Sequence, residues 1–320
     1  MAQIKPNILI ILILSILLIF GVYLSFIGGY GSDEDTLPMI YVFEKRLADG
    51  TFVTSRFTGN PVAEMGIGFL SYFFGSFIAN LVTFSLFLFG SIFIFFALSK
   101  KKDQNLYIFL LLCLSSQVLY FDNLEPIDYS WALFPFGLGF YLLSKKHLEL
   151  AILLLAISVG ARINFLIFII PMVFLFNYDY KISFNKKIII FLSIFFISGL
   201  FYIPIWYDYS FSLQWLTSAR PTEQGFIGLL SRFVYKTVLA LGLVQIIIII
   251  FTFLKSKILI INFYKNRIFF SIIFLNFLLF LYIPAELSYL QPAIIFLYLF
   301  IVKFFNKKIV YTIIFLNFFS

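Results

Sequence analysis

The sequence predicts an all-α protein, a polytopic bundle of about 10–11 transmembrane helices with short interfacial helices in the first outer loop. Hydrophobic residues make up 62% of the 320 residues, and only 12% are charged. A water-soluble domain contains roughly a quarter charged residues and could not bury this chain's 47 Phe. Apolar runs near spanning length also recur along the chain. We therefore expect one transmembrane domain over residues 1–320, in the inner (cytoplasmic) membrane.

The first apolar run, Asn7 to Ile27, follows Lys5 and has about the ~20 residues that cross hydrocarbon. A cleaved signal peptide has a shorter apolar core and a small-residue cleavage site. Here glycines follow the run instead, at Gly28, Gly29 and Gly31, and they suit the end of a helix. This segment is predicted to be a transmembrane helix that stays in the membrane.

Residues 28–64 form a polar first outer loop with an unusual number of carboxylates. They are Asp33, Glu34, Asp35, Glu44, Asp49 and Glu64. A carboxylate near hydrocarbon is costly unless it is solvated, paired or bound to a ligand. The loop is therefore predicted to lie in water at a membrane face and to form an acidic active site, and a plainly solvated loop is the alternative.

The next run, Gly66 to Leu98, is too long for a single perpendicular helix. We expect an interfacial helix over Gly66 to Ile78 and a span over Ala79 to Leu98. Further spans are expected near Leu106–Tyr120, Tyr129–Leu143, Leu148–Val159, Ile163–Phe176, Ile188–Trp206, Phe233–Leu254, Ile268–Ile283 and Tyr289–Phe304. Residues 309–320 are too few to span, so we expect a surface segment or an incomplete C-terminal hydrophobic segment.

Charge gives the orientation of these segments. Alternating the spans from a cytoplasmic N-terminus places sixteen Lys and Arg with three carboxylates inside, and seven Lys and Arg with twelve carboxylates outside. The net charges, +13 inside and −5 outside, together give the +8 of the whole chain. This split follows the positive-inside rule, which counts Lys and Arg and leaves the acidic excess outside unexplained.

Four outer loops are expected to converge on one cavity that holds these carboxylates beside Arg162, Arg220 and Arg232. Carboxylates suit proton or metal chemistry, and arginines suit a phosphate. Arg162 lies between two apolar stretches, where it either binds a lipid phosphate or snorkels to the membrane surface. Glu286 is the only charge between Arg267 and Lys303, so it is expected to face the cavity.

Other chemistries have little support in the sequence. His147, the one histidine, falls in an inner turn, which argues against a histidine-ligated zinc and a Ser-His-Asp hydrolase at the outer face. Any metal would be held by oxygen ligands, as Mg²⁺ or Mn²⁺ are. The single Cys113 forms no intramolecular disulfide. The sequence contains no phosphate-binding glycine loop. Its positive charge does not indicate a nucleic-acid partner, because basic residues in so apolar a chain mark cytoplasmic loops.

Several stretches together resemble the GT-C superfamily of integral membrane glycosyltransferases, in particular its protein mannosyltransferase and lipid A sugar transferase branch. They are Asp33-Glu34 after the first helix, Gly50 to Glu64 with Arg56, Gly59 and Pro61, then Asp128 to Leu133, Lys145-Lys146, Gly160 to Arg162, and Glu286 to Pro292. The chain differs from the family in an aromatic segment that is reduced to Tyr41 and Phe43.

The resemblance implies an inverting transfer of a sugar from a polyprenyl-phosphate donor to a lipid, glycan or protein acceptor at the outer face. Asp33 would be the base, and Glu34 and Glu64 would orient it or hold a metal. The expected donor-binding residues are Arg162, Arg220, Arg232, Glu286 and Tyr289.

Two alternatives stay open. A polysaccharide polymerase of the O-antigen type would also use lipid-linked sugars, and it is expected to rely on outer-loop arginines. A lipid-linked sugar flippase or transporter would place charges near the bilayer midplane on broken helices, whereas most charges here fall at helix ends.

The charge split generates a topology prediction. Lys100 to Lys102 and Lys181 to Lys187 should face the cytoplasm, and Asp33 to Glu64 should face outward. Reporter fusions in the three segments measure this directly. If the lysine segments and the acidic loop were found on the same side, the whole orientation would be wrong.

Overall fold

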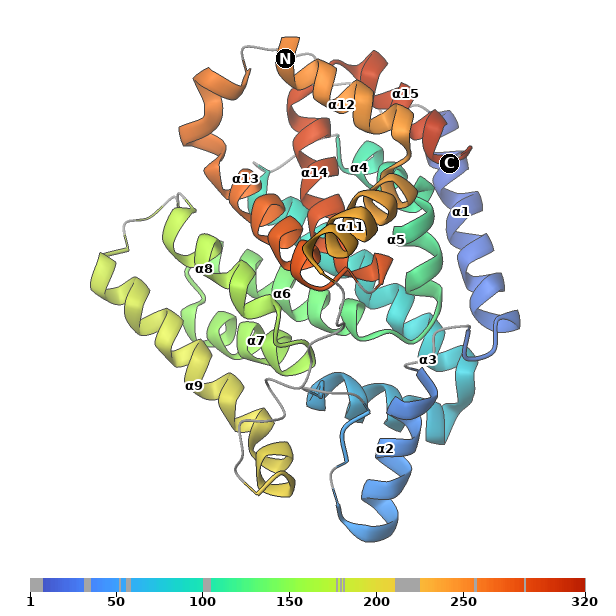
Figure 1. Ribbon diagram of the computed structural model, residues 1–320, viewed down its shortest axis with the longest axis vertical. Helices are drawn as coiled ribbons and strands as arrows, with labels where there is room; N and C mark the ends of the chain where they lie inside the picture. Colours follow the sequence, from blue (N-terminus) through green and yellow to red (C-terminus); the bar gives the residue numbers. More distant parts are fainter. Residues whose placement is uncertain are drawn as a thin grey trace. The chain divides into compact units, whose positions relative to one another are not determined.

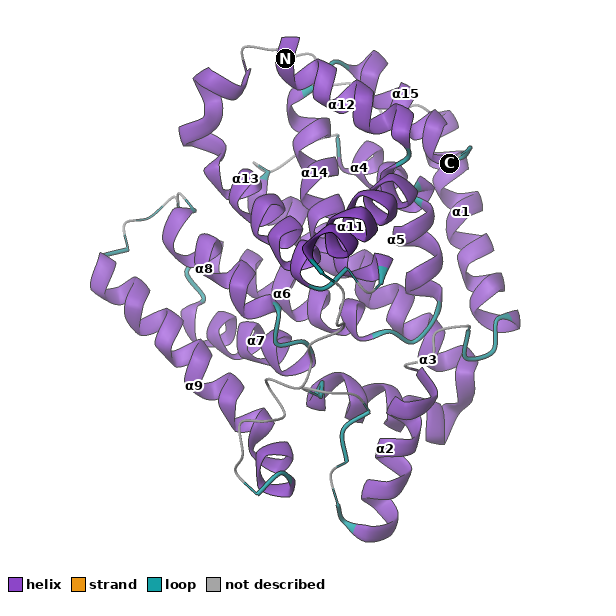
Figure 2. Ribbon diagram, viewed as in Figure 1, coloured by secondary structure: helices purple, strands orange, loops and turns teal. Residues whose placement is uncertain are grey.

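The computed structural model describes residues 8–31, 36–51, 53–55, 59–99, 105–176, 178, 180, 182–210, 225–255, 258–284 and 286–319. These residues form 14 α-helices and two short 3-10 helices, with no strand among them (Figures 1 and 2). The predicted all-α class is confirmed.

The helices follow the apolar runs of the sequence closely. They are α1 (Ile8–Ile27), α2 (Thr36–Asp49), α3 (Pro61–Leu98), α4 (Leu106–Ser115), α5 (Gln117–Phe121), η1 (Asp122–Leu124), α6 (Asp128–Ser144), α7 (Leu148–Ala161), α8 (Phe165–Leu175), α9 (Phe184–Asp208), α11 (Phe226–Leu241), α12 (Leu243–Lys255), α13 (Ile258–Tyr282), η2 (Leu287–Leu290), α14 (Gln291–Phe304) and α15 (Lys307–Asn317). The loop helix α2 matches the expectation of a short helix in the first outer loop.

Fewer helices are long enough to cross a membrane than the 10–11 spans expected from the sequence. Within the described residues, four helical segments are long and apolar enough to cross a membrane, and two bent helix pairs raise the number to six. Three shorter apolar helices, α7, α8 and Arg267–Tyr282, fall below that length. The predicted segments are thus helical, but several are interrupted or short. These lengths fit a multi-pass membrane protein.

Backbone breaks explain the interruptions. The predicted span near Leu106–Tyr120 bends by 88° where Ser116 is extended, and the span near Phe233–Leu254 bends by 90° at Gly242. Gly242 has a φ of 74°, a conformation that favours glycine. The expected division of the long run after Gly66 is also present, at Gly75 with φ 76° and ψ 179°, shortly before the expected boundary at Ile78.

Packing groups the chain into two compact units. One unit comprises residues 1–18, 101–122 and 221–320, and the other comprises 19–100 and 123–220. In the second unit α6 packs between α3 and α7, while α2 covers α3 and α9 covers α7 and α8. In the first unit α14 packs on α13 and α4, and α15 packs on α4 and α12.

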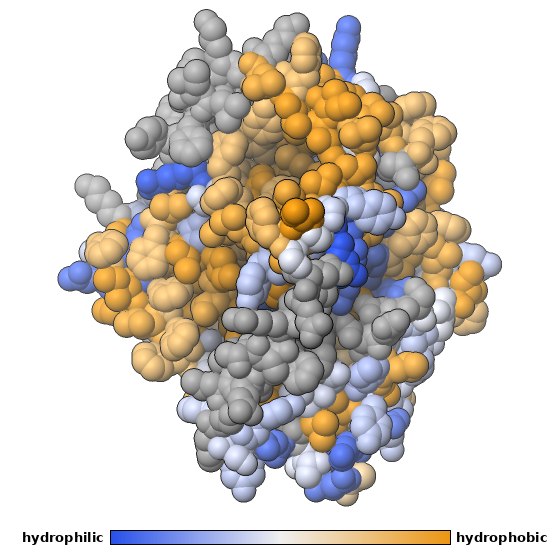
Figure 3. Space-filling view, viewed as in Figure 1, coloured by the Kyte–Doolittle hydropathy of each residue, from blue (hydrophilic) through white to orange (hydrophobic). Residues whose placement is uncertain are grey.

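Many large hydrophobic side chains are exposed on the surface of the protein, far more than on a water-soluble protein. Ile8, Ile19, Ile227 and Leu254 are 82%, 70%, 82% and 77% exposed. Figure 3 shows hydrophobic residues over wide areas of the visible face. Exposed apolar patches of this extent mark membrane contact, so lipid is the solvent of these helices.

The contact between α3 and α6 depends on two glycines. A Cβ at Gly137 would lie 2.3 Å from the carbonyl oxygen of Gly90, and one at Gly90 would lie 2.9 Å from the backbone of Leu133. No side chain fits between these backbones. Close approach through small residues is a typical way for membrane helices to associate.

This contact predicts a selective effect of adding one methyl group. Gly137→Ala should destabilise the protein by about 1–3 kcal/mol, because the new atom meets backbone that cannot rotate away. Gly199→Ala is the matched control, since Gly199 lies in α9 with nothing within 4 Å of its Cβ position. Thermal unfolding in detergent measures both. Equal stability of the two variants would contradict the proposed tight contact.

Candidate functional site

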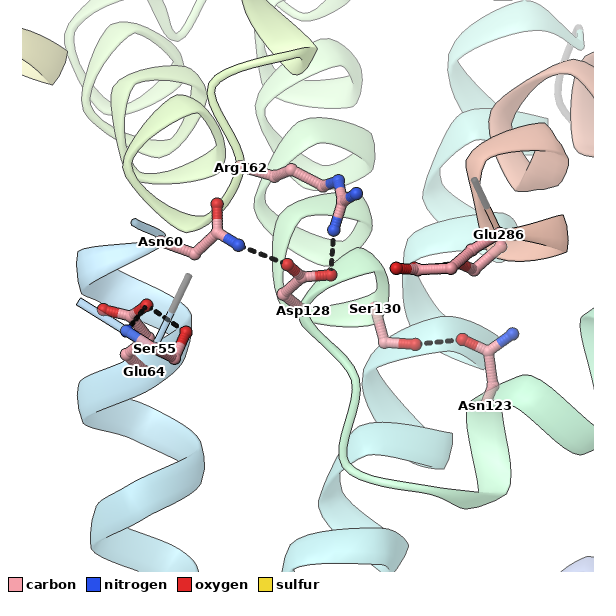
Figure 4. Close-up of polar contacts among 9 residues, drawn as sticks. Ser55, Asn60, Glu64, Asn123, Asp128, Ser130, Arg162 and Glu286 are labelled. Carbon is pink, nitrogen blue, oxygen red and sulfur yellow. Dashed lines mark hydrogen bonds and ion pairs between the residues drawn. The ribbon is translucent and has the colours of Figure 1, made fainter. Parts of the chain in front are cut away.

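Three helix ends meet around Asp128 in the second unit (Figure 4). Arg162 Nη1 forms an ion pair with Asp128 Oδ1, and Asn60 Nδ2 donates a hydrogen bond to Asp128 Oδ2. Asp128 is 1% exposed and Arg162 is 3% exposed. The Arg162 guanidinium also lies 3.5 Å from the ring centroid of Tyr129. A carboxylate, a guanidinium, an amide and an aromatic ring therefore share one buried site.

Local sequence places these groups. Asn60 is the N-cap of α3, where Pro61 takes the first helical position that proline favours. Asp128 opens α6 after extended Ile127, so its charge lies at the helix end where the dipole is favourable. Arg162 is extended, with φ −159° and ψ 113°, and ends α7. Each of these three residues thus lies where a helix begins or ends.

Glu64 occupies the first turn of α3 and is fully buried. Its Oε1 accepts hydrogen bonds from Ser55 N, at 3.1 Å, and from Ser55 Oγ. The preceding Thr54 Oγ1 is 3.1 Å from Tyr209 Oη, just past the end of α9. A Cβ at Gly59, where φ is +62°, would lie 2.6 Å from Ile205 Cδ1. The end of the first loop is therefore packed against α9.

Tyr202 lies near both Glu64 and the ion pair. This residue of α9 is 7% exposed, and its Oη donates a hydrogen bond to the carbonyl oxygen of Val159 in α7, at 2.8 Å. Glu64, Arg162 and Asp128 all lie within electrostatic reach of the Tyr202 phenol. We call Glu64, Asp128, Arg162 and Tyr202 the charged cluster. It can orient a hydroxyl or an anionic group by hydrogen bonds and charge.

The opposite ends of the same helices carry lysines. Lys145 and Lys146 follow the last residue of α6, about 25 Å along the helix from Asp128. Lys187 Nζ donates a hydrogen bond to the carbonyl oxygen of Phe174 at the end of α8. Along α6, a carboxylate therefore lies at the start and two lysines follow the end.

Two tyrosines in the loop between α8 and α9 keep their protons at this basic end. Burial raises the pKa of Tyr178 and of Tyr180 above the usual value for a phenol, and the nearby Tyr180 adds to the effect on Tyr178. The neutral hydroxyls donate hydrogen bonds to the carbonyl oxygens of Met172 and Leu143.

The structure brings together only some of the site residues predicted from the sequence. Glu64 and Arg162 come together in the charged cluster, while Asp33, Glu34 and Arg220 lie outside the described residues. Arg232 is exposed on α11 of the first unit.

Glu286 and Tyr289 also belong to the first unit. Ser288 Oγ donates to Glu286 Oε2 at 3.1 Å, and the Tyr289 carbonyl oxygen accepts from Asn276 Nδ2. Arg232 and Glu286 both act electrostatically on Lys236, so these two predicted residues gather near one lysine.

Sequence reasoning did not assign Asp128, Asn60, Ser55 or Tyr202 to the site. Asp128 begins the stretch Asp128 to Leu133 that resembles the GT-C family, and its position directly before an apolar run is a usable signal. Asn60 before Pro61 is likewise the pattern of an N-cap. Ser55 and Tyr202 join the site through tertiary packing, which leaves no local signal.

No group of three or more His, Cys, Asp or Glu that could hold a metal is present in the described part of the chain. Glu34, one of the two residues expected to hold Mg²⁺ or Mn²⁺, lies outside that part, and the other, Glu64, accepts hydrogen bonds from Ser55. The chain matches no protein-family description, no curated protein and no solved structure. The likeness to GT-C enzymes therefore rests on the residues of the sequence.

The buried ion pair yields a prediction about stability. Asp128→Ala should destabilise the protein by about 3–5 kcal/mol, because it leaves the Arg162 charge buried without its carboxylate. Replacing both partners, as in Asp128→Leu with Arg162→Met, should cost clearly less than Asp128→Ala alone. Unfolding of the purified variants in detergent measures these differences.

The control for this prediction is Asp49→Ala, at the exposed end of α2. It removes the same kind of charge from the surface and should have little effect. A double variant less stable than Asp128→Ala would contradict the account of a buried charge that needs its partner.

Proposed function

We propose that this protein is an inverting membrane glycosyltransferase that moves a sugar from a polyprenyl-phosphate donor to a lipid, glycan or protein acceptor at the outer face. The observation that supports this best is the charged cluster. It gathers two carboxylates, a guanidinium and a phenol at the helix ends opposite the lysines. Ionisable groups buried in a membrane protein are expensive and usually functional.

The chemistry of transfer needs few groups. An acceptor hydroxyl oxygen forms a bond to the anomeric carbon of the donor, while the bond from that carbon to the phosphate oxygen breaks. The hydroxyl proton passes to a carboxylate base, and the polyprenyl phosphate leaves with its negative charge. In this proposal Asp33 is the base, and Glu34 and Glu64 orient it or hold a divalent cation.

Cations near the membrane surface stabilise the departing phosphate. Arg162 is the proposed donor contact in the second unit, and Arg220, Arg232, Glu286 and Tyr289 are donor-binding residues expected from the sequence. Arg162 already holds Asp128, so a donor phosphate would share its guanidinium with that carboxylate. A guanidinium has five N–H donors in a planar fork, which permits two anionic partners.

A second candidate is a transporter or flippase of lipid-linked sugars. The two helix pairs bent by 88° and 90° favour it, because transporters bind substrates at broken helices. The charged cluster counts against it, since Asp128 and Arg162 lie at a helix start and a helix end. Transport moves an intact lipid-linked sugar, whereas transfer releases polyprenyl phosphate, so product analysis separates the two functions.

The proposed function predicts sugar transfer by the purified full chain. Incubated with polyprenyl-phosphate-linked sugars and a panel of acceptors, it should release polyprenyl phosphate and form a glycosylated product. Asp33→Asn should lower the rate about 10²–10⁴-fold, as expected for a lost general base, without unfolding the protein. Mass spectrometry of the products provides the measurement, and Asp49→Asn is the matched control in the same loop.

The outcomes discriminate between roles as well as functions. Near-normal transfer by Asp33→Asn, with loss in Glu34→Gln or Glu64→Gln, would move the base to one of those glutamates. Translocation of intact donor without release of polyprenyl phosphate would replace the transferase by the transporter.

A further inference from the structure

The basic end of the second unit carries an organised group of lysines and aromatic rings that the proposed reaction does not use. Lys146 Nζ lies 5.0 Å from the ring centroid of Tyr180, and Lys187 Nζ lies 5.8 Å from that of Tyr178. The Tyr178 and Tyr180 rings are 5.5 Å apart. Lys145 lies 5.6 Å from the ring of Tyr141. We call Lys145, Lys146, Lys187 and these three tyrosines the lysine–tyrosine cluster.

The cluster brings together lysines from the turn after α6 and from the first turn of α9. Tyr180 follows α8, yet its hydroxyl donates a hydrogen bond to the carbonyl oxygen of Leu143 in α6, at 2.6 Å. This bond places its ring beneath Lys146. Neighbouring Tyr178 then lies beside Lys187 from α9, whose Nζ is fixed on the Phe174 carbonyl oxygen. Lys187 is therefore held by a hydrogen bond, and Lys146 lies near the Tyr180 ring.

Charge at this end is strongly one-sided. Lys145, Lys146 and Lys186 are exposed, and Lys187 is partly exposed. Between residues 141 and 190, Glu149 is the only carboxylate among the described residues. Clustered lysines next to membrane helices attract anionic lipid headgroups, and tyrosines are enriched at the level where headgroups lie. An anion that carries phosphate next to an acyl chain suits both features.

We infer that the lysine–tyrosine cluster binds the headgroup of an anionic phospholipid. The lysines contact the headgroup phosphate, and the tyrosine rings lie at the boundary between headgroup and acyl chain. The positive-inside rule explains why lysines are found at this end. It does not explain why Lys146 and Lys187 lie near tyrosine rings and why Lys187 is bonded to the Phe174 carbonyl oxygen. This binding does not depend on transferase activity.

The experiment follows thermal unfolding of the full chain in detergent as phosphatidylglycerol or phosphatidylcholine is added. Wild-type protein should be stabilised saturably by phosphatidylglycerol and much less by phosphatidylcholine. Lys145→Gln with Lys146→Gln should raise the phosphatidylglycerol concentration for half-maximal stabilisation on the order of tenfold. Lys145→Arg with Lys146→Arg keeps the charges and should retain binding.

The matched control is Lys307→Gln with Lys308→Gln, which removes two exposed lysines at the start of α15 in the other unit. It should behave like wild type, and an equal loss in this control would show a bulk charge effect and overturn the inference. Equal responses to the two lipids would also overturn it. So would full stabilisation by inorganic phosphate at constant ionic strength, because the ligand would then be the free anion.

Discussion

The cost of burying charge in an apolar protein governs the arrangement of the second unit. Asp128 and Arg162 are both almost fully buried, and neither ion is tolerable in such surroundings without the other. Their pairing fixes the start of α6 against the end of α7, and Asn60 extends the same contact to the start of α3. The ends of three helices are thus held together by the side chain of Asp128. The position of Glu64 follows, because it lies in the first turn of α3.

Helix interruptions are the second constraint on the fold. Gly75, Ser116 and Gly242 each stop a run of apolar residues that composition alone would read as continuous. In lipid, every break exposes backbone groups that must find partners within the protein. The Ser116 amide donates to the carbonyl oxygen of Leu112, and the Gly242 amide donates to that of Val238. At these two breaks the preceding helix therefore keeps its last backbone hydrogen bond.

The sequence was sufficient for the fold class and for nearly every helix, because hydrophobic runs bounded by charges are a direct signal in membrane proteins. It was less informative about span number, since the short loops and glycine breaks that shorten helices do not change hydropathy. For the site, the acidic character of the first loop and the position of Arg162 were visible. The pairing of Arg162 with Asp128 was not, because contacts between α6 and α7 arise only from packing.

Arg162 has a structural role that its position in the sequence does not reveal. In the sequence Arg162 stands between two apolar stretches, which predicts that it binds a lipid phosphate or reaches to the membrane surface. In the structure its charge is balanced by Asp128, and its guanidinium lies against the Tyr129 ring. A phosphate that binds here would share this guanidinium with the carboxylate that joins α6 to α7. Donor binding and helix packing at this site would therefore be coupled through one side chain.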